Sequence, residues 1–218
     1  MDIKLLQKSL IFRNMNDDEI HSALSALQAV EKKYKKDDVV MSAGIITDTM
    51  GLVISGSVTV ESNDIWGNRT ILSHIGAGGF FAETYALLDD EVMLVDVRAN
   101  ENCRILFFKI GSLSDLNNHK EIWVNKLIFN LLQICAHKNL TLSLRSFHTA
   151  PKTVRGRIMA YLNSVSLQNH SPEFDIPFNR QQMADYLSLD RTALSKELGR
   201  MRNEGVISFR KNHFKIMG

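Results

Sequence analysis

Cysteine is scarce in this sequence, and so are other features that mark whole classes of proteins. The two cysteines, Cys103 and Cys135, stand far apart in apolar surroundings, so they indicate core residues rather than a disulfide framework or a metal motif. No apolar run approaches the length of a membrane span. The N-terminus lacks the cationic start, apolar block and cleavage site of a secretion signal. These absences predict a cytoplasmic protein without membrane contact.

Signatures of catalysis are missing as well. The sequence has no Gly-rich phosphate loop, no nucleophile elbow and no His-x-His pair, and its seven histidines are scattered. Metal-dependent enzymes need His and carboxylate ligands that converge on one point. The sequence therefore predicts no catalytic residues, no metal site and no cofactor.

The net charge is small but unevenly distributed. Of the 26 Lys and Arg and the 24 Asp and Glu, 13 basic and 6 acidic residues follow from Lys138 onward, which leaves 13 basic and 18 acidic residues before it. The C-terminal third, with a net charge of +7, is the part expected to bind a polyanion. The N-terminal part, with a net charge of −5, is expected to do something else.

Two short amphipathic patterns lie between Asn179 and Ile207, separated by a turn of a few residues. Asn179 is a candidate N-cap with Gln182 as its capping-box partner, and the second pattern follows Asp190 and ends at Gly205. The positions expected to face a core are apolar, namely Met183, Ala184, Leu187, Leu194, Leu198 and Met201. A short turn forces a steep crossing, so the second helix projects with small and cationic residues outward, a shape that fits a DNA major groove. The alternative is a helical hairpin inside a core with a solvated charged face.

The C-terminal stretch VISFRKNHFKIMG predicts a hairpin directly after this helix pair. Lys211 and Asn212 form the expected turn, and apolar residues alternate on both sides of it. A hairpin in this place is a wing. Its cations, Arg210, Lys211 and Lys215, suit phosphate contacts, which position a protein on DNA without specifying sequence.

Before Lys138 the pattern changes twice. An opening helical segment is expected over residues 16–38, followed by short apolar strand candidates that indicate a small barrel or roll, at residues 38–41, 50–62, 69–75, 91–99 and 103–109. A long helix without Gly or Pro is expected over residues 119–147. Its apolar stripe is wide and needs covering on two sides, one by the roll and the other by a partner's equivalent helix. The alternative is a core helix in a monomer. Pro151 follows as the expected hinge.

Three segments resemble the Crp/Fnr superfamily of bacterial transcription regulators. GLVISGSVTV is similar to its strand, glycine turn and strand, GGFFAETYALLDDEVMLVDVRA to its phosphate-binding cassette, and NRQQMADYLSLDRTALSKELGRMRNEGVIS to its helix-turn-helix. The resemblance implies an α+β fold with a β-roll sensor (a double-stranded β-helix) over residues 1–118, a dimerisation helix over 119–147 and a winged helix-turn-helix over 148–218. It also implies a homodimer on palindromic double-stranded DNA, with RNA polymerase as a further partner.

The resemblance also sets expectations for a ligand. Cyclic-AMP-binding relatives use a Glu on the ribose, which Glu83 matches, and an Arg-Ser pair on the phosphate, which Met93 and Leu94 replace. Leu142 and Ser143 stand where such relatives have a Thr-Ser pair. Because a buried phosphate needs a cation, cyclic AMP is not expected to bind.

The ligands that other members of the family use for an iron-sulfur cluster or a haem are also missing. No cysteine precedes Cys103 to hold an iron-sulfur cluster, and His74 lies outside the cassette that carries an axial haem ligand in haem-sensing relatives. A different, apolar effector is one hypothesis, with its pocket lined by Phe81, Tyr85, Met93, Leu94 and Leu142; the other is that these side chains fill the space themselves. A separate alternative for the whole chain is a cupin-like β-roll, either a metal-dependent enzyme or a small-molecule-binding protein, with an accessory DNA-binding domain.

The expected DNA-binding residues lie on the outward face of the second helix, at the start of the first helix and in the wing. Arg191, Thr192, Ser195 and Lys196 are the expected readers of base edges, whereas Arg180 and Lys211 are expected to meet phosphate. Thr192 and Lys196 depart from the Glu and Arg that the family commonly carries there. Because Thr192 cannot accept a hydrogen bond from cytosine as a carboxylate does, the preferred bases are expected to differ.

Overall fold

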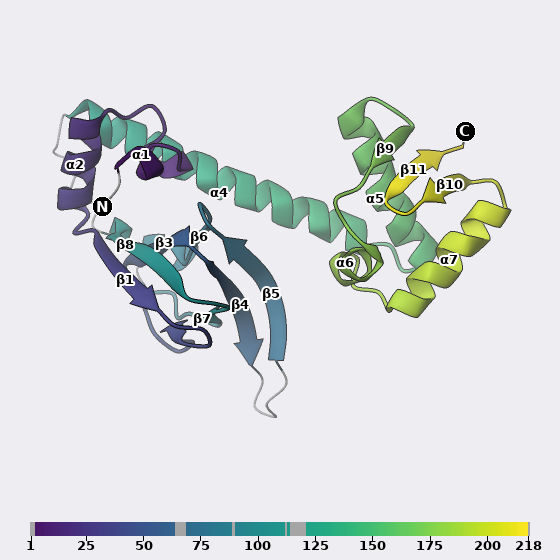
Figure 1. Ribbon diagram of the computed structural model, residues 1–218, viewed down its shortest axis with the longest axis horizontal. Helices are drawn as coiled ribbons and strands as arrows, with labels where there is room; N and C mark the ends of the chain where they lie inside the picture. Colours follow the sequence, from purple (N-terminus) through teal and green to yellow (C-terminus); the bar gives the residue numbers. More distant parts are fainter. Residues whose placement is uncertain (1–2, 64–68, 89, 112, 114–120, 218) are drawn as a thin grey trace. The chain divides into compact units, whose positions relative to one another are not determined.

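The computed structural model describes residues 3–63, 69–88, 90–111, 113 and 121–217, and it is an α+β structure as expected (Figure 1). The chain folds into two compact units, Met1–Ala136 and His137–Gly218. The boundary lies inside a long helix, α4, which spans Ile122–Thr149. The expected boundary at residues 118 and 119 falls among residues 114–120, outside the described residues.

The first unit begins with short helices. They are α1 (Ile3–Leu6), a 3-10 turn (Leu10–Phe12) and α2 (Asp17–Ala26). A reciprocal capping box between Asn16 and Glu19 starts α2. The expectation of helix through residue 38 is wrong: Gln28 has a left-handed φ of +47°, and strand β1 follows at Val30–Tyr34. Its backbone groups pair with strand β8, a long-range contact that local periodicity does not reveal.

The roll consists of two antiparallel four-stranded sheets, with strand orders β1-β8-β3-β6 and β2-β7-β4-β5. Each of the five expected strand segments contains a strand. The remaining strands of the roll are β2 (Val39–Met41), β3 (Thr49–Ser55), β4 (Ser57–Asn63), β5 (Arg69–Gly76), β6 (Phe80–Phe81), β7 (Asp96–Ala99) and β8 (Cys103–Lys109). Gly56 turns β3 into β4 with a φ of +78°, and a Cβ there would lie 2.7 Å from the Asn102 carbonyl oxygen.

Two apolar clusters stabilise this unit. One contains side chains from both sheets and includes Val58, Phe81, Met93, Val97, Cys103 and Ile105. The other joins β3 and β8 to α2 and to the buried face of α4, where Val124, Leu127, Leu131 and Ile134 are at most 5% exposed. Asn130 of α4 donates hydrogen bonds to the carbonyls of Ile11 and Arg13 at 2.9 Å, so the helix is also held by polar contacts. Cys103 is buried and Cys135 half-buried, and neither forms a disulfide.

The second unit contains the last turns of α4 and a small domain of three helices and a sheet. Its elements are α5 (Val154–Asn169), β9 (Glu173–Asp175), α6 (Arg180–Tyr186), α7 (Arg191–Asn203), β10 (Ile207–Arg210) and β11 (His213–Ile216). The sheet is antiparallel with the order β10-β11-β9, so the predicted wing hairpin is present and gains a third strand that the sequence did not reveal.

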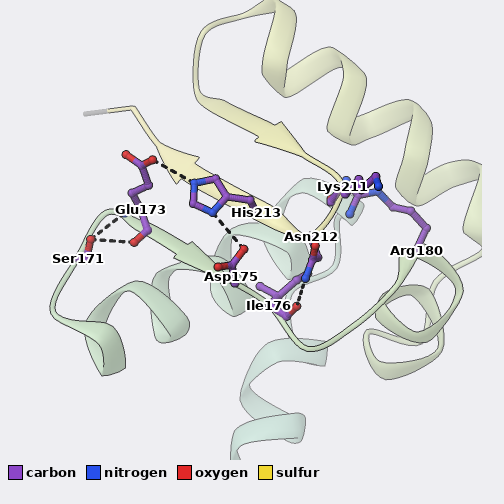
Figure 2. Close-up of polar contacts among 8 residues, drawn as sticks. All are labelled: Ser171, Glu173, Asp175, Ile176, Arg180, Lys211, Asn212 and His213. Atoms are coloured by element: carbon purple, nitrogen blue, oxygen red, sulfur yellow. Dashed lines mark hydrogen bonds and ion pairs between the residues drawn. The ribbon is translucent and has the colours of Figure 1, made fainter.

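A histidine fastens this third strand to the wing (Figure 2). The Nε2 of His213 lies 3.0 Å from Glu173 Oε1, and its Nδ1 lies 3.1 Å from Asp175 Oδ1. Because ionised carboxylates only accept hydrogen bonds, this arrangement needs a proton on both ring nitrogens. Glu173 and then Asp175 raise the pKa of His213 above its usual value. Lys215 also faces Glu173, at 3.0 Å.

We predict that the wing sheet becomes less stable as the pH rises. A histidine with a raised folded-state pKa contributes stability that is complete below its unfolded pKa of about 6.5 and is lost as the pH passes the folded pKa. The His213 ring resonances should titrate above pH 6.5 in an NMR experiment. Glu173→Gln should lower that midpoint, because it removes the strongest partner; an unchanged midpoint would contradict this assignment.

Candidate nucleic-acid interface

Capping interactions fix the ends of both helices in the helix-turn-helix. The Asn179 side chain accepts from the Gln182 N–H while the Gln182 side chain accepts from the Asn179 N–H, both at 2.9 Å, so the predicted capping box is present. Asp190 caps α7 by accepting from the N–H groups of Thr192 and Ala193 at 2.8 and 2.9 Å. Ser188 in the turn has a left-handed φ of +53°. The two helices are therefore bounded independently and joined by a tight turn.

The two faces of α7 differ as expected. All six apolar positions expected to face a core are buried in the second unit's cluster, together with Ile158, Tyr161, Leu162 and Phe214. The four expected base readers, Arg191, Thr192, Ser195 and Lys196, are exposed along the other side of the helix. The structure thus brings these four residues together on one polar face.

Two arginines of α5 hold the helix pair in place, and sequence reasoning missed both. Arg155 forms ion pairs of 2.7 Å with Glu197 and with Glu204, and these carboxylates raise its pKa. Arg157 donates to the carbonyl of Ser188 in the turn at 2.9 Å and to that of Pro151 at 2.9 Å. Apart from the contact with Pro151, which lies six positions away, these contacts join residues more than 30 positions apart, so no local pattern marks them.

A buried histidine ties the end of α4 to the helix-turn-helix. His148 is 3% exposed, with Nδ1 2.9 Å from the Tyr186 hydroxyl of α6 and Nε2 2.8 Å from the Ser164 hydroxyl of α5. Burial lowers its pKa, which favours a neutral ring. The His148 side chain therefore fixes the last turn of α4 to α5 and to α6.

The wing presents cations beside the start of α6. Arg210 and Lys211 are exposed, and Lys211 has a left-handed φ of +56°. Arg180 is half-buried instead, and its guanidinium donates to the Lys211 carbonyl at 2.8 Å (Figure 2). A pocket of about 500 Å³ opens between the wing turn and α6, lined by Pro177, Phe178, Asn179, Arg180, Gln182, Lys211 and Asn212.

The seven expected effector-pocket residues divide into separate groups. Phe81 and Met93 are each 1% exposed in the core of the roll, with Tyr85 packed against the same cluster. Glu83 is buried at the start of α3 (Glu83–Leu87), after Ala82 with a left-handed φ of +62°.

The remaining three candidates are exposed. Leu94 is 73% exposed, although its N–H donates to the Tyr85 hydroxyl at 3.4 Å. Leu142 and Ser143 are exposed on α4 in the second unit. In the described ranges, no three His, Cys, Asp or Glu side chains are grouped to hold a metal ion, and no described helix is long and apolar enough to span a membrane.

Comparison with known proteins matches both units. The cyclic nucleotide-binding domain family matches residues 31–119, and the Crp-like helix-turn-helix domain family matches residues 156–217. The chain is 25% identical over 180 residues to the cAMP-activated global transcriptional regulator CRP of Haemophilus influenzae, covering 80% of this chain and 78% of that protein. It is 24% identical over 202 residues to the Cyclic AMP receptor protein of Thermus thermophilus, covering 93% and 89%.

Solved structures show the same fold. OCPA-complexed CprK superposes with a TM-score of 0.65 at 13% identity, covering 92% of both chains. The c-di-GMP responsive global regulator CLP of Xanthomonas campestris gives a TM-score of 0.58 at 18% identity, covering 93% of this chain and 100% of that one. With a cyclic nucleotide-binding-like roll, a long helix and a Crp-like helix-turn-helix in this order, the chain belongs to the Crp/Fnr superfamily and is a DNA-binding transcription regulator of that type.

Proposed function

We propose that this protein binds a palindromic double-stranded DNA site as a homodimer and responds to an effector other than cyclic AMP. The observation that carries the proposal is the polar face of α7, where Arg191, Thr192, Ser195 and Lys196 are exposed opposite a fully buried apolar face. A helix of this kind fits the major groove, where Arg reads guanine and Thr contacts the thymine methyl. The family membership supports RNA polymerase as a further partner and a cytoplasmic location.

The wing supplies the sequence-independent part of binding. Arg210 and Lys211 are exposed beside the pocket at the start of α6, and the region from Lys138 onward has an excess of seven positive charges. Cations at such positions bind phosphates and release counterions, which makes affinity depend on salt. Lys211 therefore positions the protein on the duplex, and α7 reads the sequence.

The outer face of α4 supports the homodimer. Phe129, Leu132, Leu140 and Phe147 are between 57% and 63% exposed, at spacings of three, eight and seven residues. Large apolar side chains repeating in this way along a helix form the seam of a two-stranded coiled coil. A dimer built on this face presents two copies of α7 to half-sites about 34 Å apart.

The core of the roll argues against cyclic AMP. Met93, at the position of the phosphate-binding arginine in cyclic-AMP-binding relatives, is buried among apolar side chains. Arg98, five residues further along the chain, is engaged by Glu61 at 3.2 Å and by the Asp37 carbonyl at 2.8 Å. A buried phosphate without a counter-charge is too costly to desolvate. The burial of Phe81 and Met93 supports a roll filled by its own side chains, so an effector has to bind where Tyr85 and Leu94 reach the surface or displace these residues.

Coupling between the sensor and DNA runs through the end of α4 in this proposal. His148 fixes the last turn of α4 to α5 and α6, and Arg157 fixes Pro151 to the turn between α6 and α7. A rotation of the dimer helices then moves the helix-turn-helix as a body instead of being absorbed at the hinge. The comparisons favour this regulator over the cupin-like alternative.

We expect Arg191→Ala and Lys211→Ala to weaken DNA binding in different ways. Arg191→Ala should cost about 1–3 kcal/mol on the preferred site and relax the choice at one base pair, whereas Lys211→Ala should weaken all sequences alike and reduce the salt slope by about 1. Fluorescence anisotropy with specific and scrambled duplexes over a range of KCl concentrations measures both effects. Equal losses on the two duplexes for Arg191→Ala would remove it from the base readers.

Leu132→Glu should convert the dimer to a monomer, because it places a carboxylate in the apolar seam. Sedimentation velocity measures the change directly. Leu167→Glu is the matched control, since Leu167 is a 75% exposed leucine on α5, outside the proposed seam. The dimer proposal is wrong if the wild-type protein sediments as a monomer or if both variants remain dimeric.

Isothermal titration calorimetry with cyclic AMP should show no binding at micromolar affinity. The physical reason is the buried Met93 at the phosphate position. Met93→Arg is not expected to create a site by itself, because the new cation would be buried in the roll's core. Micromolar binding to the wild-type protein would overturn the assignment of the effector class.

A further inference from the structure

The guanidinium of Arg180 lies on the inside of the wing. Its carbon is 4.9 Å from the ring centre of Phe209 and 5.1 Å from that of Phe214. The two rings are themselves stacked, with centres 5.5 Å apart. Burial lowers the pKa of Arg180, as expected for a cation withdrawn from water.

The same guanidinium holds the backbone of the wing turn. Its Nη2 donates to the Lys211 carbonyl at 2.8 Å, and Figure 2 shows Arg180 reaching this residue from the start of α6. On the other side of the turn, the Ile176 N–H donates to the Asn212 carbonyl at 2.9 Å, and the Asn212 side chain donates to the Ile176 carbonyl at 3.2 Å. The turn is therefore fixed from two sides.

The backbone of Lys211 needs such support. Its φ of +56° is a left-handed conformation, which is unfavourable for a residue with a Cβ. A planar guanidinium can stack on rings and donate to a carbonyl at once, which a lysine ammonium cannot do in the same way. The contact from Arg180 thus supports the backbone from which the exposed Lys211 side chain projects.

We propose that Arg180 is a positioning residue, which acts on DNA by aiming Lys211 and the wing turn rather than by binding a phosphate itself. The inference rests on the proposed DNA-binding function and replaces the phosphate contact that was expected from the position of Arg180 at the start of the first helix. In this proposal Lys211 binds the phosphate. It can do so only while Arg180 of α6 holds the wing turn.

A double-mutant cycle with salt titration tests this role. Arg180→Lys and Arg180→Ala should each weaken binding to the specific duplex roughly tenfold and lower the salt slope by about 0.9, the share of one phosphate contact. In the Lys211→Ala background, either Arg180 substitution should cost less than about twofold, because the residue it positions is already gone. A control cycle between Lys196→Ala and Lys211→Ala should be additive, since these residues lie on different elements.

A direct phosphate contact gives different results. Lysine also binds phosphate as a point charge, so Arg180→Lys would then retain most of the affinity and the salt slope. The loss from Arg180→Ala would add in full to that from Lys211→Ala. Either result overturns the inference.

Amide hydrogen exchange in the DNA-free protein tests the support of the wing turn by Arg180 independently of DNA binding. Arg180→Lys should increase exchange at the N–H groups of Ile176 and His213, which flank the wing turn, while the amides inside α7 stay protected, which also shows that the domain remains folded. Unchanged exchange in the wing turn would overturn the inference whether or not the wild-type protein binds DNA. A wild-type protein that fails to bind DNA would instead overturn the proposed function.

Discussion

The presentation of α7 depends on the burial of one apolar face. Leu194, Leu198 and Met201 are at most 1% exposed, and their burial against α5, α6 and the wing places the opposite, polar face in solvent. Burying an aliphatic side chain of this size contributes about 1.5–3 kcal/mol, more than any surface contact of the helix. The Asp190 cap, the ion pairs from Arg155 and the contact from Arg157 then fix the helix's ends and its turn. The DNA-binding surface is thus a consequence of packing, and polar contacts refine it.

The core of the roll consists of apolar side chains. Its two sheets enclose an apolar cluster in which Phe81 and Met93 are buried, and its cation Arg98 is paired with Glu61. The long helix α4 leaves the first unit with one apolar face buried and the other exposed. This helix links the roll to the helix-turn-helix domain, and His148 holds its last turn.

Features that follow from local periodicity were predictable from the sequence. The capping box at Asn179, the cap at Asp190 and the buried positions of α6 and α7 all come from side chains within one or two turns of each other. The glycine turns and alternating strands of the roll are equally local. In contrast, β1 and β9 exist because they pair with β8 and β11, so their short polar sequences gave no signal.

The residues of the site that the sequence did not reveal also depend on contacts between distant positions. Arg155, Arg157 and His148 bind residues that only the fold brings near them. Nothing next to these three residues in the sequence marks that role. The sequence shows the charge of Arg180 and its place at a helix start, whereas its stacking on Phe209 and Phe214 requires the three-dimensional arrangement of the wing.

The most direct test of the central claim is selection from a randomised duplex library by the purified, ligand-free protein. A homodimer that reads DNA with α7 should enrich a palindrome whose half-sites are centred about one helical turn, or 10 base pairs, apart. Sequence-independent but salt-dependent binding without enrichment would assign the missing specificity to an effector. No binding to any duplex at low salt would contradict the assignment of α7 and the wing as a DNA-binding surface.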